Sequence, residues 1–166
     1  MRRVVVTGLG LVSPLGCGVD TSWKNILEGR SACAPITKFN AESFATKYAC
    51  EIPFGDERGE FRPSDWMEEK DRRKVDDFIL YGIAASKEAL DDSSWVPKTD
   101  TDCLRTGVMI GSGIGGLDLI YKTSRLLNEK GPRRVSPFFI PGALINLVSG
   151  QVSIRFGLKG PNHSVV

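Results

Sequence analysis

Thiols and a single imidazole are the candidates for nucleophilic or acid–base chemistry in this chain. Its four cysteines are Cys17, Cys33, Cys50 and Cys103, and none of them shares the close paired spacing of a zinc site. We therefore expect free thiols that are buried or half-buried, in keeping with a reducing compartment, and no metal centre. No bound cofactor is expected either. The only histidine, His163, follows a Gly-Pro turn on a predicted strand.

A glycine-rich loop offers a different chemistry. Gly111, Gly113 and Gly116 follow the apolar run Val108–Ile110 with the G-x-G-x-x-G spacing that binds dinucleotide pyrophosphate at a helix N-terminus. That fingerprint also needs an acidic residue at the end of a second strand, about twenty positions on. Glu129 has nearly the right spacing but lies at the end of a predicted helix. A tight turn is the favoured interpretation, and a nicotinamide-dependent oxidoreductase is the alternative.

Basic side chains gather in two places. Lys70, Arg73 and Lys74 fall on one face of a predicted helix, and Arg133 and Arg134 form a second group. Such groups steer an acidic partner toward its docking surface. Acidic residues are interspersed with the first group, so a solvated charged face is the competing interpretation.

The elements that must position these residues alternate between strands and helices. We expect buried strands at 4–6, at 108–110 and from His163 onward. Amphipathic helices are predicted at 20–27, 64–92, 117–130 and 141–156. The first begins at N-cap candidates among residues 20–22. The last two each end at a glycine. This order predicts an α/β fold with a parallel sheet, and residues 30–63 an irregular surface excursion.

Composition excludes several classes of protein. The chain has 166 residues, 41% of them hydrophobic and 25% charged, as in soluble globular proteins. No apolar run is long enough for a membrane span, and a net charge of +2 does not indicate a nucleic-acid partner. Because Met1-Arg2-Arg3 leads directly into Val4, we expect no signal peptide and a cytoplasmic protein.

Four segments in the same order carry a resemblance that covers essentially the whole chain. Residues 4–16, 73–82, 111–116 and 136–141 resemble the opening strand and loop, the long helix and the pocket segments of the β-ketoacyl-acyl-carrier-protein synthases, most closely the elongating type II class. The resemblance implies a thiolase-like fold, of which residues 1–166 would be most of the first of two related α/β halves.

The same resemblance implies the chemistry. Family members hold an acyl group on a cysteine, decarboxylate malonyl-carrier protein and join the two by a Claisen condensation. The nucleophilic cysteine is expected just after Val166 and the two catalytic histidines in the second half. His163 matches neither histidine and is expected to be structural. No catalytic residue is therefore assigned within 1–166, and this segment alone is expected to be inactive.

The resemblance also assigns roles to residues that are present. Ile114 corresponds to a gate that admits long acyl chains, and Phe139 to a pocket-lining aromatic that reaches the partner subunit of a homodimer. Their alternative role is ordinary core packing. Carrier-protein docking is implied for five basic residues: Lys70, Arg73, Lys74, Arg133 and Arg134.

Two function hypotheses follow from the resemblance. The first is a homodimeric condensing enzyme of fatty-acid elongation. The second is a paralogue without the cysteine, such as a chain-length factor or a decarboxylase, because everything up to Val166 would look the same in both.

Overall fold

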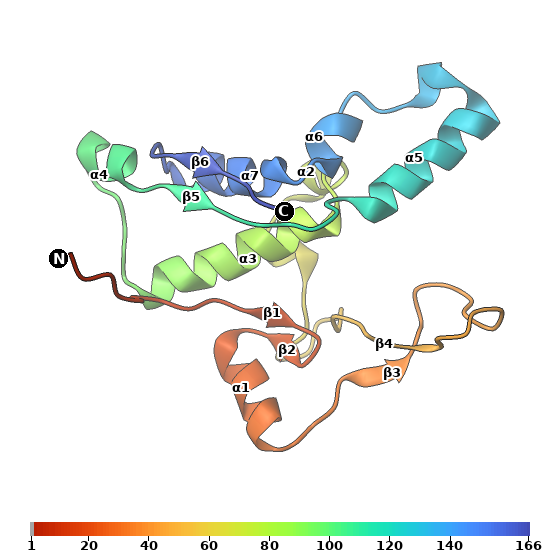
Figure 1. Ribbon diagram of the computed structural model, residues 1–166, viewed down its shortest axis with the longest axis horizontal. Helices are drawn as coiled ribbons and strands as arrows, with labels where there is room; N and C mark the ends of the chain where they lie inside the picture. Colours follow the sequence, from red (N-terminus) through yellow and green to blue (C-terminus); the bar gives the residue numbers. More distant parts are fainter. Residues whose placement is uncertain (1) are drawn as a thin grey trace.

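The computed structural model describes residues 2–166 and shows short strand pairs set among longer helices (Figure 1). The strands are β1 (Val12–Ser13), β2 (Gly16–Cys17), β3 (Cys33–Pro35), β4 (Tyr48–Cys50), β5 (Val108–Met109) and β6 (Asn162–His163). The α-helices are α1 (Val19–Leu27), α2 (Glu69–Arg72), α3 (Asp77–Asp92), α4 (Asp100–Arg105), α5 (Leu117–Lys130), α6 (Phe139–Ala143) and α7 (Asn146–Phe156). Two 3₁₀ helices complete the set, η1 (Pro63–Asp65) and η2 (Pro132–Arg134).

Strands β5 and β6 form the parallel pair that the sequence predicts. Their predicted burial is wrong except at Val108, because Met109 is 70% exposed and Asn162 and His163 are both exposed. Val108 lies opposite Asn162, and the backbone bonds continue past the strand ends, where the N–H of Ser112 donates to the carbonyl of Val165 at 3.1 Å. The segment between them crosses over through α5, α6 and α7, as parallel pairing requires. This pair places the glycine-rich loop beside residues 164–166.

The N-terminal run differs from its prediction. Val4, Val5 and Val6 are 94%, 71% and 78% exposed and pair with no other strand of the described residues 2–166. The prediction of a buried strand is wrong for this structure, because a strand is buried only where neighbours cover it on both faces. The residues that follow, 8–11, run alongside α3 (Figure 1).

Backbone contact holds that segment on α3. A Cβ atom at Gly10 would lie 1.9 Å from the carbonyl oxygen of Ala85, so only glycine permits this approach. The carboxylate of Glu88 accepts from the backbone N–H of Leu11 at 2.8 Å and of Val19 at 2.7 Å. The first helix therefore begins at Val19, after Gly18, with a carboxylate from α3 at its N-terminus. The capping residues predicted at 20–22 do not fill that role.

The helix predicted over 64–92 is divided into η1, α2 and α3. Asp76 interrupts it in an extended conformation, with φ −85° and ψ 159°. Its N–H donates to the carbonyl of Gly142 at 3.2 Å, and its carboxylate binds another helix. A tertiary contact thus overrides the helical pattern at this point.

The core lies where α3 packs against α7. Ile79, Leu80 and Ile83 of α3 and Val148 and Val152 of α7 are each at most 2% exposed. Helix α3 is therefore the central helix of the core. Phe61 is fully buried beside it, stacked on Trp66 and edge-to-face with Tyr81.

The excursion over residues 30–63 contains one antiparallel strand pair, β3 with β4. Most of its side chains are exposed, and Phe61 attaches its end to the core. Among residues 2–166, no helix is long and apolar enough to cross a membrane.

Two further differences concern the helices. The pattern over 141–156 forms α6 and α7, separated at Leu144 and Ile145, and α7 ends at Gly157 in the left-handed conformation, with φ 68°. Helix α4 was not predicted. Its capping box, formed by Thr99 and Asp102, is a local signal that would have located it.

Candidate functional site

Three segments that are distant in the sequence meet at the start of α5. The carboxylate of Asp76 accepts from the backbone N–H of Leu119 at 2.8 Å, and the N–H of Gly116 donates to the carbonyl of Ala143 at 2.9 Å. Gly142 is buried between the carbonyl of Lys74 and the side chain of Leu119, with no room for a Cβ. The turn before α3, the glycine-rich loop and α6 are therefore fixed relative to one another.

The glycine-rich loop is anchored at both ends and open in the middle. At one end, the backbone N–H of Ser112 donates to the carbonyl of Val165. At the other, Gly115 has φ 79°, and a Cβ added to it would lie 2.4 Å from the carbonyl oxygen of Ala143. A Cβ at Gly113, by contrast, would meet no atom within 4 Å. The loop thus has fixed ends and free space around its central residues.

Ile114 occupies the centre of this loop and is 65% exposed. It lies beyond the carboxyl end of β5, the edge at which open α/β sheets bind ligands. Phe139 is the half-buried first residue of α6, whose last residue, Ala143, contacts the loop. The structure therefore brings the two expected pocket residues onto adjoining segments. With most of its side chain exposed, Ile114 is not a core residue of this chain.

The first basic group is paired with carboxylates. The Nζ atom of Lys70 lies 2.7 Å from Oε2 of Glu68, and Nε of Arg73 lies 3.3 Å from Oε1 of Glu69. Lys74 bonds to Asp71 at 2.6 Å. The hydrogen bond from Lys74 lowers the pKa of Asp71, and the hydrogen bond to Glu68 raises the pKa of Lys70. Lys70, Arg73 and Lys74 are therefore partly neutralised.

The second basic group, in contrast, is not neutralised by carboxylates of the described residues. Arg133 and Arg134 lie exposed in η2, and within residues 2–166 neither forms a salt bridge. The segment that follows them is linked to the first group, because the ammonium of Lys74 lies 5.2 Å from the ring centroid of Phe138, a cation–π contact. The two groups thus border connected segments, α2 and the η2–α6 connection.

The histidine and the cysteines, the remaining candidates for catalysis, do not form an active-site arrangement within the described residues. His163 is exposed on β6, and its side chain forms no hydrogen bond with residues 2–166, although its carbonyl accepts from Ile110. All four cysteines are free thiols, and burial raises the pKa of Cys17. Cys17 and Cys103 are half-buried as expected, whereas Cys33 and Cys50 are exposed because they lie on the surface excursion. The described part of the chain holds no cluster of three or more histidine, cysteine, aspartate or glutamate side chains placed to bind a metal.

Sequence reasoning missed the partner that fixes β6. The side-chain amide of Asn162 donates to the carbonyl of Ser149 at 3.0 Å, and its oxygen accepts from the hydroxyl of Ser149 at 2.9 Å. Ser149 is fully buried on α7. No local signal in the sequence identifies this pair, because its two residues lie on different elements.

The geometry does not suit the dinucleotide alternative. The Asp76 carboxylate already occupies the first turn of α5, where it would repel a pyrophosphate. Glu129 lies within α5 and pairs with Arg125, and no strand follows α5 before β6 in the described residues. The loop instead serves the close backbone contacts at Gly115 and Gly116.

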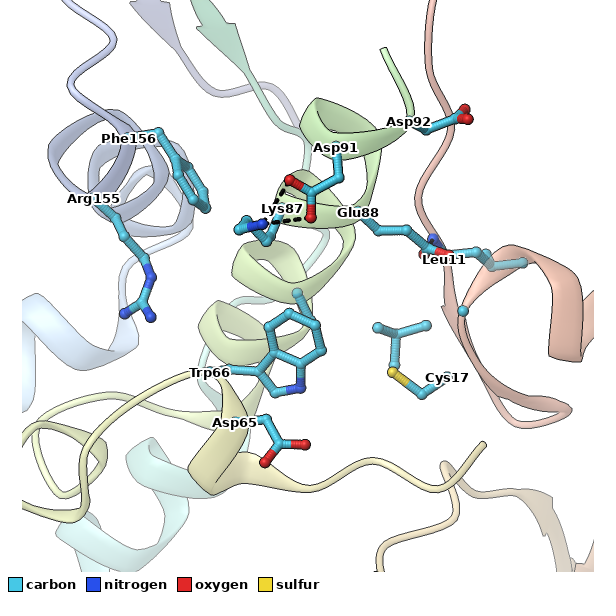
Figure 2. Close-up of a pocket in the computed structure, with 13 residues that line it drawn as sticks. Leu11, Cys17, Asp65, Trp66, Lys87, Glu88, Asp91, Asp92, Arg155 and Phe156 are labelled. Carbon is cyan, nitrogen blue, oxygen red and sulfur yellow. Dashed lines mark hydrogen bonds and ion pairs between the residues drawn. The ribbon is translucent and has the colours of Figure 1, made fainter. Parts of the chain in front are cut away.

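A cleft of about 640 Å³ lies elsewhere, between the β1–β2 turn, the end of α3 and the end of α7 (Figure 2). Its carboxylates have structural partners: Glu88 and Asp92 accept from N-terminal backbone N–H groups, Asp91 pairs with Lys87, and Asp65 pairs with Arg62. None of the expected pocket or docking residues lines it. The cleft therefore reflects how the N-terminal segment is held on α3.

Comparison with known sequences gives a consistent family. The model of the family described as "Beta-ketoacyl synthase, N-terminal domain" matches residues 1–166. The chain is 58% identical over 167 residues to 3-oxoacyl-[acyl-carrier-protein] synthase 2 of Rhizobium meliloti, covering 100% of this chain and 40% of that protein. It is 49% identical to the synthase 2 of Vibrio harveyi, covering 99% of this chain and 38% of that protein. The chain thus spans about two fifths of the length of these curated relatives.

Solved structures agree on the fold. The ishigamide ketosynthase/chain length factor has a TM-score of 0.81 at 27% identity, covering 99% of this chain and 40% of that one. A type II PKS acyl-carrier protein in complex with its ketosynthase bound to the hexaketide has a TM-score of 0.74 at 26% identity, covering 99% and 42%. The expectation of a thiolase-like α/β fold is therefore confirmed.

Proposed function

Because this chain belongs to the β-ketoacyl synthase family, as its N-terminal domain, we propose that the protein elongates fatty acids by decarboxylative Claisen condensation. The observation that carries the proposal is 58% identity, across the whole chain, to a protein named 3-oxoacyl-[acyl-carrier-protein] synthase 2. In the proposed reaction an acyl group moves from its carrier protein to a cysteine thiol. Malonyl-carrier protein then loses CO₂, and its carbanion attacks the thioester.

In this reaction residues 1–166 supply contacts and not the nucleophile. Ile114 is proposed as the gate, since its loop has fixed ends at Ser112 and Gly116 and open space beside Gly113. Displacing one apolar side chain would admit an alkyl chain, whose burial is worth roughly 0.8 kcal/mol per methylene. Phe139, on the adjoining α6, is proposed to line an acyl pocket and to reach the partner subunit of a homodimer.

Acyl carrier protein is the proposed partner of the basic groups. A related solved ketosynthase is bound to its acyl-carrier protein, at 26% identity to this chain. Arg133 and Arg134 are proposed to contribute most, because they are exposed and free of carboxylates within residues 2–166, whereas Lys70, Arg73 and Lys74 are each paired. Carrier-protein acidic groups would have to displace those internal partners first.

One assay distinguishes the proposed condensing enzyme from its paralogues. The full-length protein, given acyl- and malonyl-carrier protein, is expected to release CO₂ and to form a ketoacyl product two carbons longer. Release of CO₂ without that product would indicate a decarboxylase. Neither CO₂ nor product, from folded protein, would support a chain-length factor, a class that is named together with a ketosynthase for a related solved structure.

A further inference from the structure

Two cysteines that are distant in the sequence lie directly opposite each other in the excursion. The antiparallel register of β3 and β4 pairs Cys33 with Cys50, Ala34 with Ala49 and Pro35 with Tyr48. Both cysteines are exposed free thiols. The proposed condensation uses neither of them.

The hydrogen-bond pattern fixes the type of pairing. Ile36 and Lys47 form the pair next to Pro35 and Tyr48. The N–H of Ile36 donates to the carbonyl of Lys47 at 2.9 Å, so this is a hydrogen-bonded pair. Because hydrogen-bonded and non-hydrogen-bonded pairs alternate, Pro35–Tyr48 and Cys33–Cys50 are non-hydrogen-bonded pairs. Pro35 agrees with this assignment, since at such a position its missing N–H breaks no bond to the neighbouring strand.

Non-hydrogen-bonded pairs bring side chains closest together. Their Cα atoms lie about 4.5 Å apart, within the range of about 4.4–6.8 Å that a disulfide spans. Directly opposite residues also project from the same face of the strand pair. Cys33 and Cys50 can therefore be joined with little movement of the backbone.

We propose that Cys33 and Cys50 form a reversible disulfide that links β3 to β4 and closes the loop between them. The oxidant is a low-molecular-weight disulfide of the glutathione class. One protein thiolate attacks it, forming a mixed disulfide and releasing one small thiol; the second protein thiolate then attacks the protein sulfur and releases the other. The protein loses two electrons and two protons, and the small disulfide is reduced to two thiols.

Peptide mapping of the full-length protein tests this directly. Trypsin separates the cysteines, because Cys33 lies in the peptide Ser31–Lys38 and Cys50 in Tyr48–Arg58. After equilibration with oxidised glutathione, we expect these two peptides as one cross-linked species, about 2 Da lighter than their sum, that dithiothreitol separates. Cys33→Ser and Cys50→Ser each abolish it, and the matched control Cys103→Ser retains it.

A kinetic signature distinguishes a resolving pair from two independent thiols. In each single variant the remaining cysteine is expected to accumulate a glutathione adduct, whereas the wild-type protein converts that adduct to the cross-link. Recovery of both wild-type peptides as separate glutathione adducts, or as separately alkylated thiols after full oxidation, would overturn the proposal. Neither result depends on condensing activity.

Discussion

The carboxylate of Asp76 caps helix α5 from 43 residues away, accepting a hydrogen bond from the backbone N–H of Leu119 at 2.8 Å. Gly116, at the N-cap position of α5, has no side chain that could do so. Asp76 also interrupts the helical pattern that precedes α3, and its backbone N–H donates to the carbonyl of Gly142. This one residue therefore connects the turn before α3, the start of α5 and α6.

Replacing Asp76 should loosen the first turn of α5. We expect Asp76→Ala to cost about 1 kcal/mol locally, the usual value of a lost cap, and Asp76→Asn less, since the amide keeps an acceptor. Hydrogen exchange of the α5 amides in the full-length protein measures this as an increase of about fivefold. Asp118→Ala is the control, because Asp118 is in the same turn but pairs with Lys122. Equal effects of the Asp76 and Asp118 changes would contradict the capping role.

The excursion should respond to acid at Glu51. Its pKa is lowered, chiefly by the hydroxyl of Thr37, which donates to it at 2.6 Å. Because the folded pKa lies below the unfolded value of about 4.3, this stabilisation is present above that value and is lost as pH falls through the folded one. Thr37→Val should raise the pKa of Glu51, observed by NMR titration of labelled glutamate carboxyl groups. Thr46→Val is the control; an unchanged Glu51 titration in Thr37→Val would refute the assignment.

Carrier-protein binding should depend more on η2 than on α2. We expect the double change Arg133→Glu with Arg134→Glu to weaken binding about tenfold at low salt, and Lys70→Glu with Arg73→Glu less, because carboxylates already neutralise the latter pair. Both effects should shrink as salt increases. The same charge change at Lys98 and Arg105, on the α4 side of the molecule, is the control in binding measurements with acyl-carrier protein. Equal losses in all three proteins would indicate a general charge effect and no defined docking surface.

Enlarging the gate should discriminate between substrates by length. Ile114→Phe in the full-length enzyme is expected to lower kcat/KM for long acyl chains by about tenfold while sparing short ones, because the larger ring obstructs the opened loop. Steady-state kinetics with carrier-protein substrates of different chain length measure the ratio. Ile26→Phe, on α1, serves as the control for added bulk. A uniform loss across chain lengths would show a packing defect at Ile114 instead.

Local signals in the sequence located much of the fold. The apolar run at Val108, the glycine that ends α5 at Gly131 and the left-handed Gly157 that ends α7 each act within a few residues of the chain, so pattern and conformational preference sufficed. The family resemblance assigned pocket roles to Ile114 and Phe139, which stay predictions, while the contact between their two segments became visible only in the structure.

The rest depended on contacts between residues far apart in the chain. The pattern predicts a helical Asp76, yet the residue is extended. Its carboxylate accepts from the N–H of Leu119 and its own N–H donates to the carbonyl of Gly142, and these two hydrogen bonds hold it out of the helix. The run at Val4 has strand character but no strand partner in residues 2–166, and the opposition of Cys33 and Cys50 follows from a ladder register that no spacing rule encodes. Sequence by itself determined the family and the locally specified elements; only the tertiary structure decided which polar groups satisfy one another, because such pairing depends on distances in space and not along the chain.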